Sequence, residues 1–277
     1  MFEPFTERAR AKVNLALHVL GRRPDGYHEL DSIVAFAEAG DSLRFSPADE
    51  FSISADGPFA RDLPTTADNT IAKAYRKVAE IAEARGKVLP AVSVHLTKNL
   101  PVAAGIGGGS ANAAAAMRGF LKIAGITGPD DAIMAAALTL GADVPVCLMG
   151  CTCRMQGIGE RLTPLDDFPE LHTVLVNPNV AVPTAEVFRK LGLAPGQSHG
   201  SAIADVGDPS TWRNDLTDPA IADAPVIGEA LSLLRDLPDV RHVTMSGSGA
   251  TCLALFVGAA PRDLGTGLLP PGWWLSF

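Results

Sequence analysis

Hydrophobic and polar positions alternate early in the chain, where residues 11–19 read AKVNLALHV. Successive side chains of a β-strand point to opposite faces, so this alternation predicts a strand. One face carries Val13, Leu15, Leu17 and Val19, and the other carries Lys12, Asn14 and His18. The Pro-Asp-Gly sequence at 24–26 then predicts a turn, so that Tyr27 begins the return strand of a hairpin.

A period near 3.6 residues replaces the alternation further along and predicts helices. The segment 68–86 has an apolar stripe made of Ile71, Ala74, Tyr75, Val78 and Ala82. Further helices are expected at 110–124, 129–140 and around 219–236, and strands at 91–96, 144–155, before 245 and at 251–257. The mixture predicts an α+β or α/β fold whose second half begins near 155–175. A long polar connection over 193–214 is expected to be a mobile or functional loop.

Four of the five residues from 105 to 109 are glycine, directly before the alanine-rich helix expected at 110–124. Fixing glycine costs more backbone entropy than fixing any other residue, so the cluster needs a reason. Converging backbone N–H groups form an anion-binding concavity, and the start of a helix adds a partial charge of roughly +0.5. The arrangement therefore predicts a phosphate site. The alternative is a flexible surface loop, against which Pro101 and the apolar flanks argue.

Two common phosphate-binding motifs do not fit this loop. A Walker loop has Lys and then Ser or Thr after its last glycine, whereas this chain has Ser110 and Ala111. A dinucleotide fingerprint turns tightly from strand to helix and is followed by an acidic residue at the end of the next strand. Here residues 99–104 intervene before the glycines, and Asp130 and Asp131 are expected in the first turn of a helix.

Composition narrows the functional classes. The 277 residues are 47% hydrophobic and 19% charged, which predicts an ordinary globular protein. A net charge of −8 disfavours nucleic acid as a partner, so an anionic substrate must be held by local dipoles and a few cations. The N-terminus lacks the apolar core of a signal peptide, and no apolar stretch reaches the ~18 residues of a membrane span. We therefore expect a cytoplasmic protein that does not enter membranes.

The cysteines suggest no disulfide framework. Cys147, Cys151 and Cys153 have the spacing C-x3-C-x-C, which lacks the paired C-x2-C units of structural zinc sites. We expect them to be small buried hydrophobic residues in strands, with a metal role as the less favoured alternative.

Six segments together resemble a kinase superfamily. ARAKVNLALHVLGRR at 9–23, PVAAGIGGGSANAA at 101–114 and MSGSGATCLALF at 245–256 resemble the galactokinase, homoserine kinase, mevalonate kinase and phosphomevalonate kinase superfamily. DGYHELDSI at 25–33, LGADVPVCLMG at 140–150 and NPNVAVPTAEVF at 177–188 are similar to its branch in the non-mevalonate isoprenoid pathway. That branch phosphorylates the 2-hydroxyl of 4-diphosphocytidyl-2-C-methyl-D-erythritol with ATP. The resemblance implies a two-domain α+β fold, with an ATP-binding domain over 1–160, a substrate-side domain over 161–277 and both substrates in the cleft between them.

The resemblance also implies roles for individual residues. Asp143 would accept or orient the hydroxyl proton, and Lys12 would hold Asp143 ionised and polarise the hydroxyl. Asn69 and Lys98 would lie around the adenine, and the rest of the nucleotide would be bound by Pro101, Val102, Ala103, Ala104, Gly105, Ile106, Gly107, Gly108, Gly109, Ser110 and Ala111. The cytidyl substrate would be bound by Asn14 at its erythritol hydroxyls, by His28 at the edge of the cytosine, and by an aromatic sandwich of Tyr27 and Phe188. The turn at 246–251 would brace the phosphate loop and line the substrate pocket. Mg²⁺ would be carried mainly by the nucleotide and water.

Two positions depart from the superfamily pattern. Ala111 stands where many relatives have a second hydroxyl, which leaves Ser110 as the hydroxyl for phosphate or magnesium, and Ala250 stands where proline is frequent. Neither departure changes a charged group.

Taken by themselves, these residues leave other interpretations open. Lys12 could be an ordinary solvated strand lysine, Asp143 a helix or turn cap, and Asn69 the N-cap of the helix at 68–86. Tyr27 and Phe188 could be core aromatics. The alternative functions are another small-molecule kinase of the superfamily, a catalytically silent nucleotide-binding regulator, and a dinucleotide-dependent oxidoreductase. Lys12 and Asp143 argue against the silent regulator, and the context of the glycine loop argues against the oxidoreductase.

Overall fold

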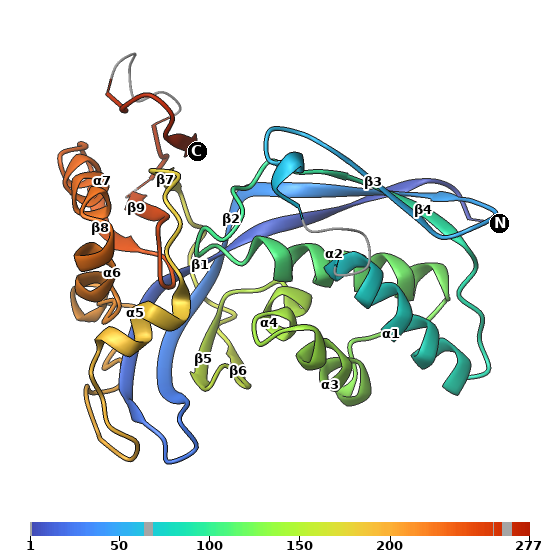
Figure 1. Ribbon diagram of the computed structural model, residues 1–277, viewed down its shortest axis with the longest axis horizontal. Coiled ribbons are helices and arrows are strands. Elements are labelled where there is room, and N and C mark those ends of the chain that lie inside the picture. The colour runs from blue at the N-terminus through green and yellow to red at the C-terminus, as the bar shows by residue number, and fades with distance from the viewer. Residues whose placement is uncertain (1, 64–68, 257, 262–267) are drawn as a thin grey trace. The chain divides into compact units, whose positions relative to one another are not determined.

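The computed structural model describes residues 2–63, 69–256, 258–261 and 268–277, which Figure 1 colours from blue at the N-terminus to red at the C-terminus. By their contacts, the residues fall into two units whose segments interleave along the chain. The first unit contains residues 1–11, 39–102 and 107–150, and the second contains residues 12–38, 103–106 and 151–277. The division of roles between 1–160 and 161–277 stays a prediction, and the last change of unit falls between residues 150 and 151.

Two long strands contribute residues to both units. β1 (Phe5–Arg22) pairs with β2 (His28–Pro47), and in the turn between them the N–H of Arg23 donates to the carbonyl of Tyr27 at 2.7 Å. The hairpin expected from the sequence is therefore confirmed, with its return strand beginning at His28. Both strands lie in a six-stranded sheet of order β3-β4-β2-β5-β6, in which β1 also pairs with β2.

Each unit adds its own strands to β2. In the first unit, β4 (Val92–Thr97) pairs antiparallel with residues 42–47, and β3 (Ser52–Asp56) pairs parallel with β4. In the second unit, β5 (Cys153–Gly157) pairs antiparallel with residues 30–34 and with β6 (Arg161–Pro164). Different strands therefore fix the two ends of β2.

The first unit has an alanine-rich helix, α2 (Gly108–Ile123), against which α1 (Thr70–Ala84), α3 (Asp131–Leu140) and α4 (Val144–Met149) pack, and a short 3-10 helix, η1 (Ala60–Asp62). Half of the buried positions of α2 are alanine, and these small side chains let α1 and α4 pack closely against it. Phe120 of α2 adds an aromatic contact, with its ring 5.3 Å from Tyr75 and 5.4 Å from Phe45. The helices expected at 68–86, 110–124 and 129–140 are confirmed, with shifted ends.

The strand expected over 144–155 is wrong in its first half. Residues 144–149 form α4, which begins with Pro145 in its first turn and ends at Gly150 in the left-handed conformation (φ 67°). A short apolar run does not distinguish a buried strand from a buried helix, and proline is favoured in the first turn of a helix. Only β5 follows the prediction.

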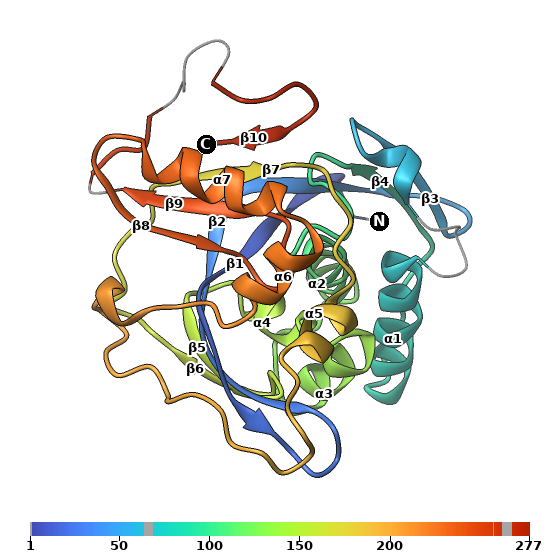
Figure 2. The same cartoon turned by 60° about the vertical axis from the view of Figure 1, so that its left-hand side comes forward.

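The second unit contains a separate antiparallel sheet of order β10-β7-β9-β8. Its strands are β7 (Thr173–Asn177), β8 (Val240–Met245), β9 (Cys252–Phe256) and β10 (Trp274–Ser276). Its helices are α5 (Thr184–Lys190), η2 (Pro209–Thr211), α6 (Thr217–Asp223) and α7 (Val226–Arg235). Figure 2 shows α7 against β8 and β9, with which it is in contact.

The helix expected around 219–236 is two helices. Pro225 separates α6 from α7, and Ala224 before it has the non-helical angles φ −136° and ψ 84°. Proline disfavours the helical conformation of the residue that precedes it, which accounts for the break. Among the described residues, no helix combines the length and the apolarity that a membrane span requires.

Candidate active site

The glycine loop leads into α2 two residues earlier than the sequence suggested. Of the four glycines, Gly105 (φ 74°) and Gly107 (φ 61°) have left-handed backbone angles, whereas Gly108 and Gly109 form the first turn of the helix. The first helical bond runs from the N–H of Ala111 to the carbonyl of Gly107 at 2.7 Å. The N–H groups of 108–110 precede it and have no acceptor within the helix, as at the start of any α-helix. These donors carry no bulky side chain, which suits an approaching phosphate.

The other part of the loop is fixed by the turn at 246–251, as expected for a bracing segment. Ser246 Oγ donates to the carbonyl of Gly105 at 2.9 Å, and Thr251 donates to the carbonyl of Ala104 from its N–H at 3.2 Å and from Oγ1 at 2.6 Å. A Cβ on Gly105 would lie 2.5 Å from the carbonyl oxygen of Ser246 and 2.6 Å from that of Gly249. Glycine is therefore required at 105 for space as well as for its backbone angle.

Lys12 is buried on β1. Its relative exposure is 4%, its Nζ donates to Asn14 Oδ1 at 3.1 Å, and its N–H donates to the carbonyl of Ile106 at 3.0 Å. The interpretation of Lys12 as a solvated strand lysine is wrong, because both faces of this part of β1 are buried. A buried lysine beside the glycine loop brings a cation to residues 104–106 of the second unit.

Asp143 occupies the N-cap position of α4 without acting as a cap. Its side chain is half-buried and accepts no capping hydrogen bond. Asp130, at the same position of α3, does accept the N–H of Ile133 at 3.0 Å. The interpretation of Asp143 as a helix cap is therefore not supported, because the capping hydrogen bond is not made. Asp143 belongs to the first unit and Lys12 to the second.

Lys98 lies beside the start of α2 in the first unit. A Cβ on Gly108 would be 3.3 Å from Lys98 Nζ, which donates to Asp41 Oδ2 at 2.5 Å. Asp41 Oδ1 also accepts the N–H groups of Asn99 at 2.7 Å and Leu100 at 2.8 Å. Burial lowers the pKa of Lys98, against the opposing charge and hydrogen bond of Asp41. Sequence reasoning missed Asp41, whose position depends on the distant pairing of β2 with β4.

Asn69 is the N-cap that the sequence predicted. Its side chain accepts the N–H of Ile71 at 2.9 Å at the start of α1. Thr70 Oγ1 donates to the carbonyl of Gly109 at 3.3 Å, so the first turns of α1 and α2 are neighbours. Asn69 thus lies at the same end of the first unit as Lys98 and the first turn of α2.

The proposed cytosine residues lie in the second unit. Tyr27 is 61% exposed, so its interpretation as a core residue is wrong. Phe188 on α5 is half-buried against the hydrophobic core, and its ring centroid lies 4.7 Å from that of His28. Burial, together with the nearby Arg22 and His199, lowers the pKa of His28. A neutral imidazole offers one donor and one acceptor, which suits the edge of a base.

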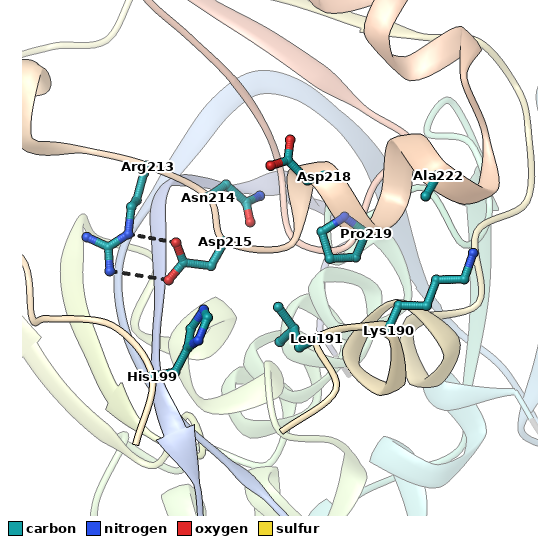
Figure 3. A pocket seen from close by; sticks show the side chains of 9 residues that line it. All are labelled: Lys190, Leu191, His199, Arg213, Asn214, Asp215, Asp218, Pro219 and Ala222. Atoms are coloured by element: carbon teal, nitrogen blue, oxygen red, sulfur yellow. Dashed lines mark hydrogen bonds and ion pairs between the residues drawn. The ribbon is translucent and has the colours of Figure 1, made fainter. Parts of the chain in front are cut away.

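A pocket of about 770 Å³ lies elsewhere on the second unit (Figure 3). Its lining has charges of both signs, and Arg213 Nε pairs with Asp215 Oδ1 at 2.6 Å. The lining residues are Lys190, Leu191, His199, Arg213, Asn214, Asp215, Asp218, Pro219 and Ala222. The described lining contains none of the residues expected to bind substrate.

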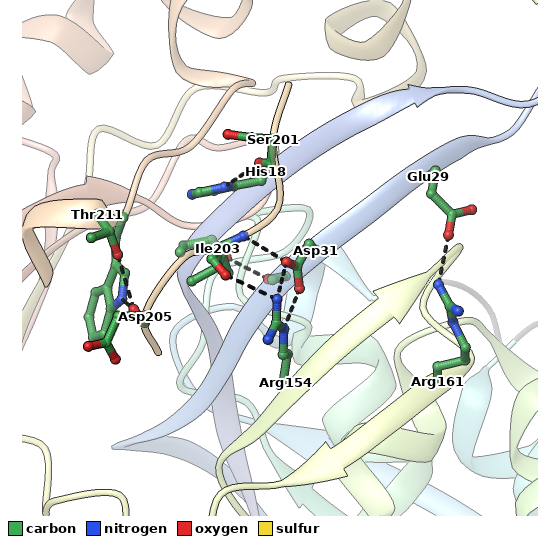
Figure 4. Close-up of polar contacts among 12 residues, drawn as sticks. His18, Glu29, Asp31, Arg154, Arg161, Ser201, Ile203, Asp205 and Thr211 are labelled. Atoms are coloured by element: carbon green, nitrogen blue, oxygen red, sulfur yellow. Dashed lines mark hydrogen bonds and ion pairs between the residues drawn. The ribbon is translucent and has the colours of Figure 1, made fainter. Parts of the chain in front are cut away.

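The connection over 193–214 is held to the β-hairpin by polar bonds (Figure 4). The fully buried Asp31 on β2 accepts two hydrogen bonds from Arg154, at 2.8 and 2.6 Å, and one from the N–H of Ile203 at 2.8 Å. Burial alone would raise the pKa of Asp31, but these bonds and the Arg154 charge keep it below its usual value. His18 Nδ1 also lies 3.0 Å from the carbonyl of Ser201. The long loop expected here is thus tied to β1 and β2.

The cysteines differ from one another. Cys153 is buried on β5 as expected, and burial raises the pKa of its thiol to about 12. Cys147 is buried on a helix rather than a strand, and Cys151 is exposed. In the described parts of the chain, no group of three or more His, Cys, Asp or Glu side chains is placed to hold a metal ion.

Comparison with known proteins finds relatives that align with nearly the whole chain. Residues 69–151 match the model of the GHMP kinases N terminal domain. The 4-diphosphocytidyl-2-C-methyl-D-erythritol kinase of Rhodopseudomonas palustris (strain HaA2) is 45% identical, over 98% of this chain and 96% of its own length. The enzyme of the same name from Ruegeria pomeroyi is 46% identical, over 97% and 96%. A crystal structure of 4-(cytidine 5'-diphospho)-2C-methyl-D-erythritol kinase is 32% identical, with a TM-score of 0.74 over 91% of this chain and 90% of the other.

Proposed function

The chain belongs to the 4-diphosphocytidyl-2-C-methyl-D-erythritol kinase family, and we propose that it phosphorylates the 2-hydroxyl of that cytidyl alcohol with ATP, using Lys12 and Asp143. The observation that carries the proposal is the identity of 45% over 98% of the chain. The protein is a small-molecule kinase, so the remaining question is which of its residues perform each part of the reaction.

The start of α2 is the proposed site of the ATP phosphates. The N–H groups of Gly108, Gly109 and Ser110 precede the first helical bond, and the helix adds a partial charge of roughly +0.5 at that end. The rest of the stretch 101–111 shapes the loop, and Asn69 and Lys98 flank it within the first unit. Local dipoles and a buried lysine can hold a polyanion although the whole chain has a charge of −8.

Asp143 and Lys12 are the proposed catalytic residues. As the 2-hydroxyl oxygen bonds to the γ-phosphorus, the bond from that phosphorus to the β,γ-bridging oxygen breaks, and ADP leaves with the electron pair. Asp143 accepts or orients the hydroxyl proton, and Lys12 stabilises the developing negative charge. The burial of Lys12 beside the glycine loop supports its role, and Asp143 is half-buried at the start of α4.

Tyr27, His28 and Phe188 are proposed to bind the cytosine, and Asn14 the erythritol hydroxyls. An exposed tyrosine ring has a free face on which a base can stack, and His28 and Phe188 already form a ring pair. We propose that Mg²⁺ arrives with ATP, because it keeps several waters and binds phosphate oxygens readily. Ser110 is the hydroxyl of the loop that could join its shell or bind phosphate.

The experiment is coupled detection of ADP release with three alcohols. The full cytidyl substrate is compared with 2-C-methyl-D-erythritol 4-phosphate, which lacks cytidine, and with CDP-glycerol, which lacks the methylerythritol. We expect turnover with the full substrate to exceed turnover with either fragment by about 100-fold or more, because stacking and polar contacts are then both made. Equal turnover with the cytidine-free alcohol would point to a different kinase of the superfamily.

A further inference from the structure

Three buried polar side chains form a continuous chain of hydrogen bonds in the second unit. Lys12 Nζ donates to Asn14 Oδ1 at 3.1 Å, and Asn14 Nδ2 donates to Ser32 Oγ at 2.8 Å. Ser32 Oγ in turn donates to the carbonyl of Ala16 at 2.6 Å. The relative exposures are 4% for Lys12, 1% for Asn14 and 0% for Ser32, so water does not readily replace these partners.

The chemistry of the two outer groups fixes the orientation of the amide between them. A lysine ammonium can only donate hydrogen bonds, so it requires the oxygen of the Asn14 amide. Ser32 has one hydroxyl proton, which is used on the carbonyl of Ala16, so its Oγ can only accept from Asn14. A half-turn of the amide would place an NH₂ group against the ammonium. Ser32 therefore determines which end of Asn14 faces Lys12.

The backbones of these residues are already fixed by other contacts. The N–H of Asn14 donates to Ser246 Oγ at 3.1 Å, and Ser246 Oγ donates to the carbonyl of Gly105 in the phosphate loop. Ser32 is opposite Met155 in the pairing of β2 with β5. The rotation of the Asn14 side chain is thus the freedom that remains, and Ser32 limits it.

We propose that Ser32 is a positioning residue for phosphoryl transfer, which orients the Asn14 amide so that its oxygen holds the Lys12 ammonium in place. This inference rests on the proposed catalytic role of Lys12. Ser32 itself acts through Asn14 and contacts neither substrate. Its removal is expected to affect turnover more than the binding of ATP, because the phosphate loop keeps its own bonds to Ser246 and Thr251.

The test is a kinetic double-mutant cycle. Ser32→Ala is expected to lower kcat by roughly tenfold to hundredfold, since small displacements of a catalytic group cost about that much, while KM for ATP changes less than about twofold. In an Asn14→Ala background, Ser32→Ala should have almost no further effect on kcat, because the two residues act in series. Ser32→Thr keeps the hydroxyl and should restore most of the turnover. Thr244→Val, which removes another buried hydroxyl of the second unit, is the matched control and should retain kcat.

Two results would overturn the proposal. One is a folded Ser32→Ala protein with a kcat within about twofold of the parent, and the other is the same loss in the parent and Asn14→Ala backgrounds. If Ser32→Ala does not fold, Ser32→Cys keeps the volume but accepts hydrogen bonds weakly, and the same criteria apply to it. Lys12→Met is measured beside them. If Lys12→Met keeps the kcat of the parent, the catalytic role of Lys12 is refuted. If Lys12→Met loses turnover but Ser32→Ala keeps the kcat of the parent, the role of Ser32 alone is refuted.

Discussion

Replacing Gly109 with alanine should change stability and ATP affinity in opposite directions. Gly109 is the second residue of α2, and a Cβ placed on it meets no atom within 4 Å. Alanine loses less backbone entropy than glycine in a helix, so the free energy of unfolding should rise by about 0.5–1 kcal/mol. A Cβ on a helix is tilted toward the N-terminus, where the proposed phosphate site lies. ATP affinity should therefore fall by at least about tenfold, or ~1.4 kcal/mol.

The two effects are measured on one protein. Denaturant unfolding gives the change in stability, and calorimetric titration with ATP gives the change in affinity. Gly228→Ala is the matched control, because Gly228 is in the first turn of α7 and its added Cβ would meet only Ile221 atoms, at 3.8 and 3.9 Å. It should gain similar stability without any loss of ATP affinity. A more stable Gly109→Ala protein that binds ATP as tightly as the parent would refute the placement of the phosphates at the start of α2.

Three further changes test other parts of the chain. Asp143→Asn should lower turnover by about 10²–10⁴-fold in an ADP-release assay and leave ATP affinity unchanged, whereas a mere cap would tolerate Asn because Asn and Asp cap about equally. Tyr27→Ala should raise KM for the cytidyl substrate by an amount equivalent to about 1–3 kcal/mol of lost binding, because the base loses its stacking partner. KM for ATP and the stability should change little, and equal increases in KM for both substrates would contradict a cytosine site. Burial lowers the pKa of His242 from 6.5 in the folded protein. Near and below pH 6.5 the unfolded chain therefore binds more protons than the folded one, and the free energy of unfolding should decrease as the pH is lowered. His242→Gln should reduce that slope in denaturant titrations at pH 5 to 7, and an unchanged slope would assign it to other groups.

Local patterns predicted the elements that local physics determines. The alternation at 11–19 predicted the strand, the Pro-Asp-Gly sequence predicted its hairpin, and Asn69 marked the start of α1 as a cap. Asp130, expected in the first turn of a helix, is the N-cap of α3 instead. The glycine cluster pointed to a loop before a helix, but not to which glycines belong to each. Gly108 and Gly109 are compatible with either conformation, and the start of α2 was settled by packing of its alanines against α1 and α4.

The burial of the polar face of β1 could not be predicted from alternation. Lys12 and Asn14 alternate with apolar residues as in a strand with one solvated face, yet both are buried. The partners of Asn14, Ser32 and Ser246, come from distant parts of the sequence. A two-residue period reports which side chains share a face, and tertiary packing decides whether that face meets water.

The same reasoning applies to three polar residues of β2 for which the sequence indicated no role. Asp31, Ser32 and Asp41 are each at most 1% exposed, and each bonds to a side chain at least 18 positions away in sequence. Buried polar groups cost free energy unless they are paired, so these three residues are tolerable only in the folded chain, where their partners are present. In the second unit Ser32 is linked to Lys12 through Asn14, and in the first unit Asp41 pairs directly with Lys98. One strand therefore supports both proposed cationic groups, and we expect a change in β2 to alter turnover through them.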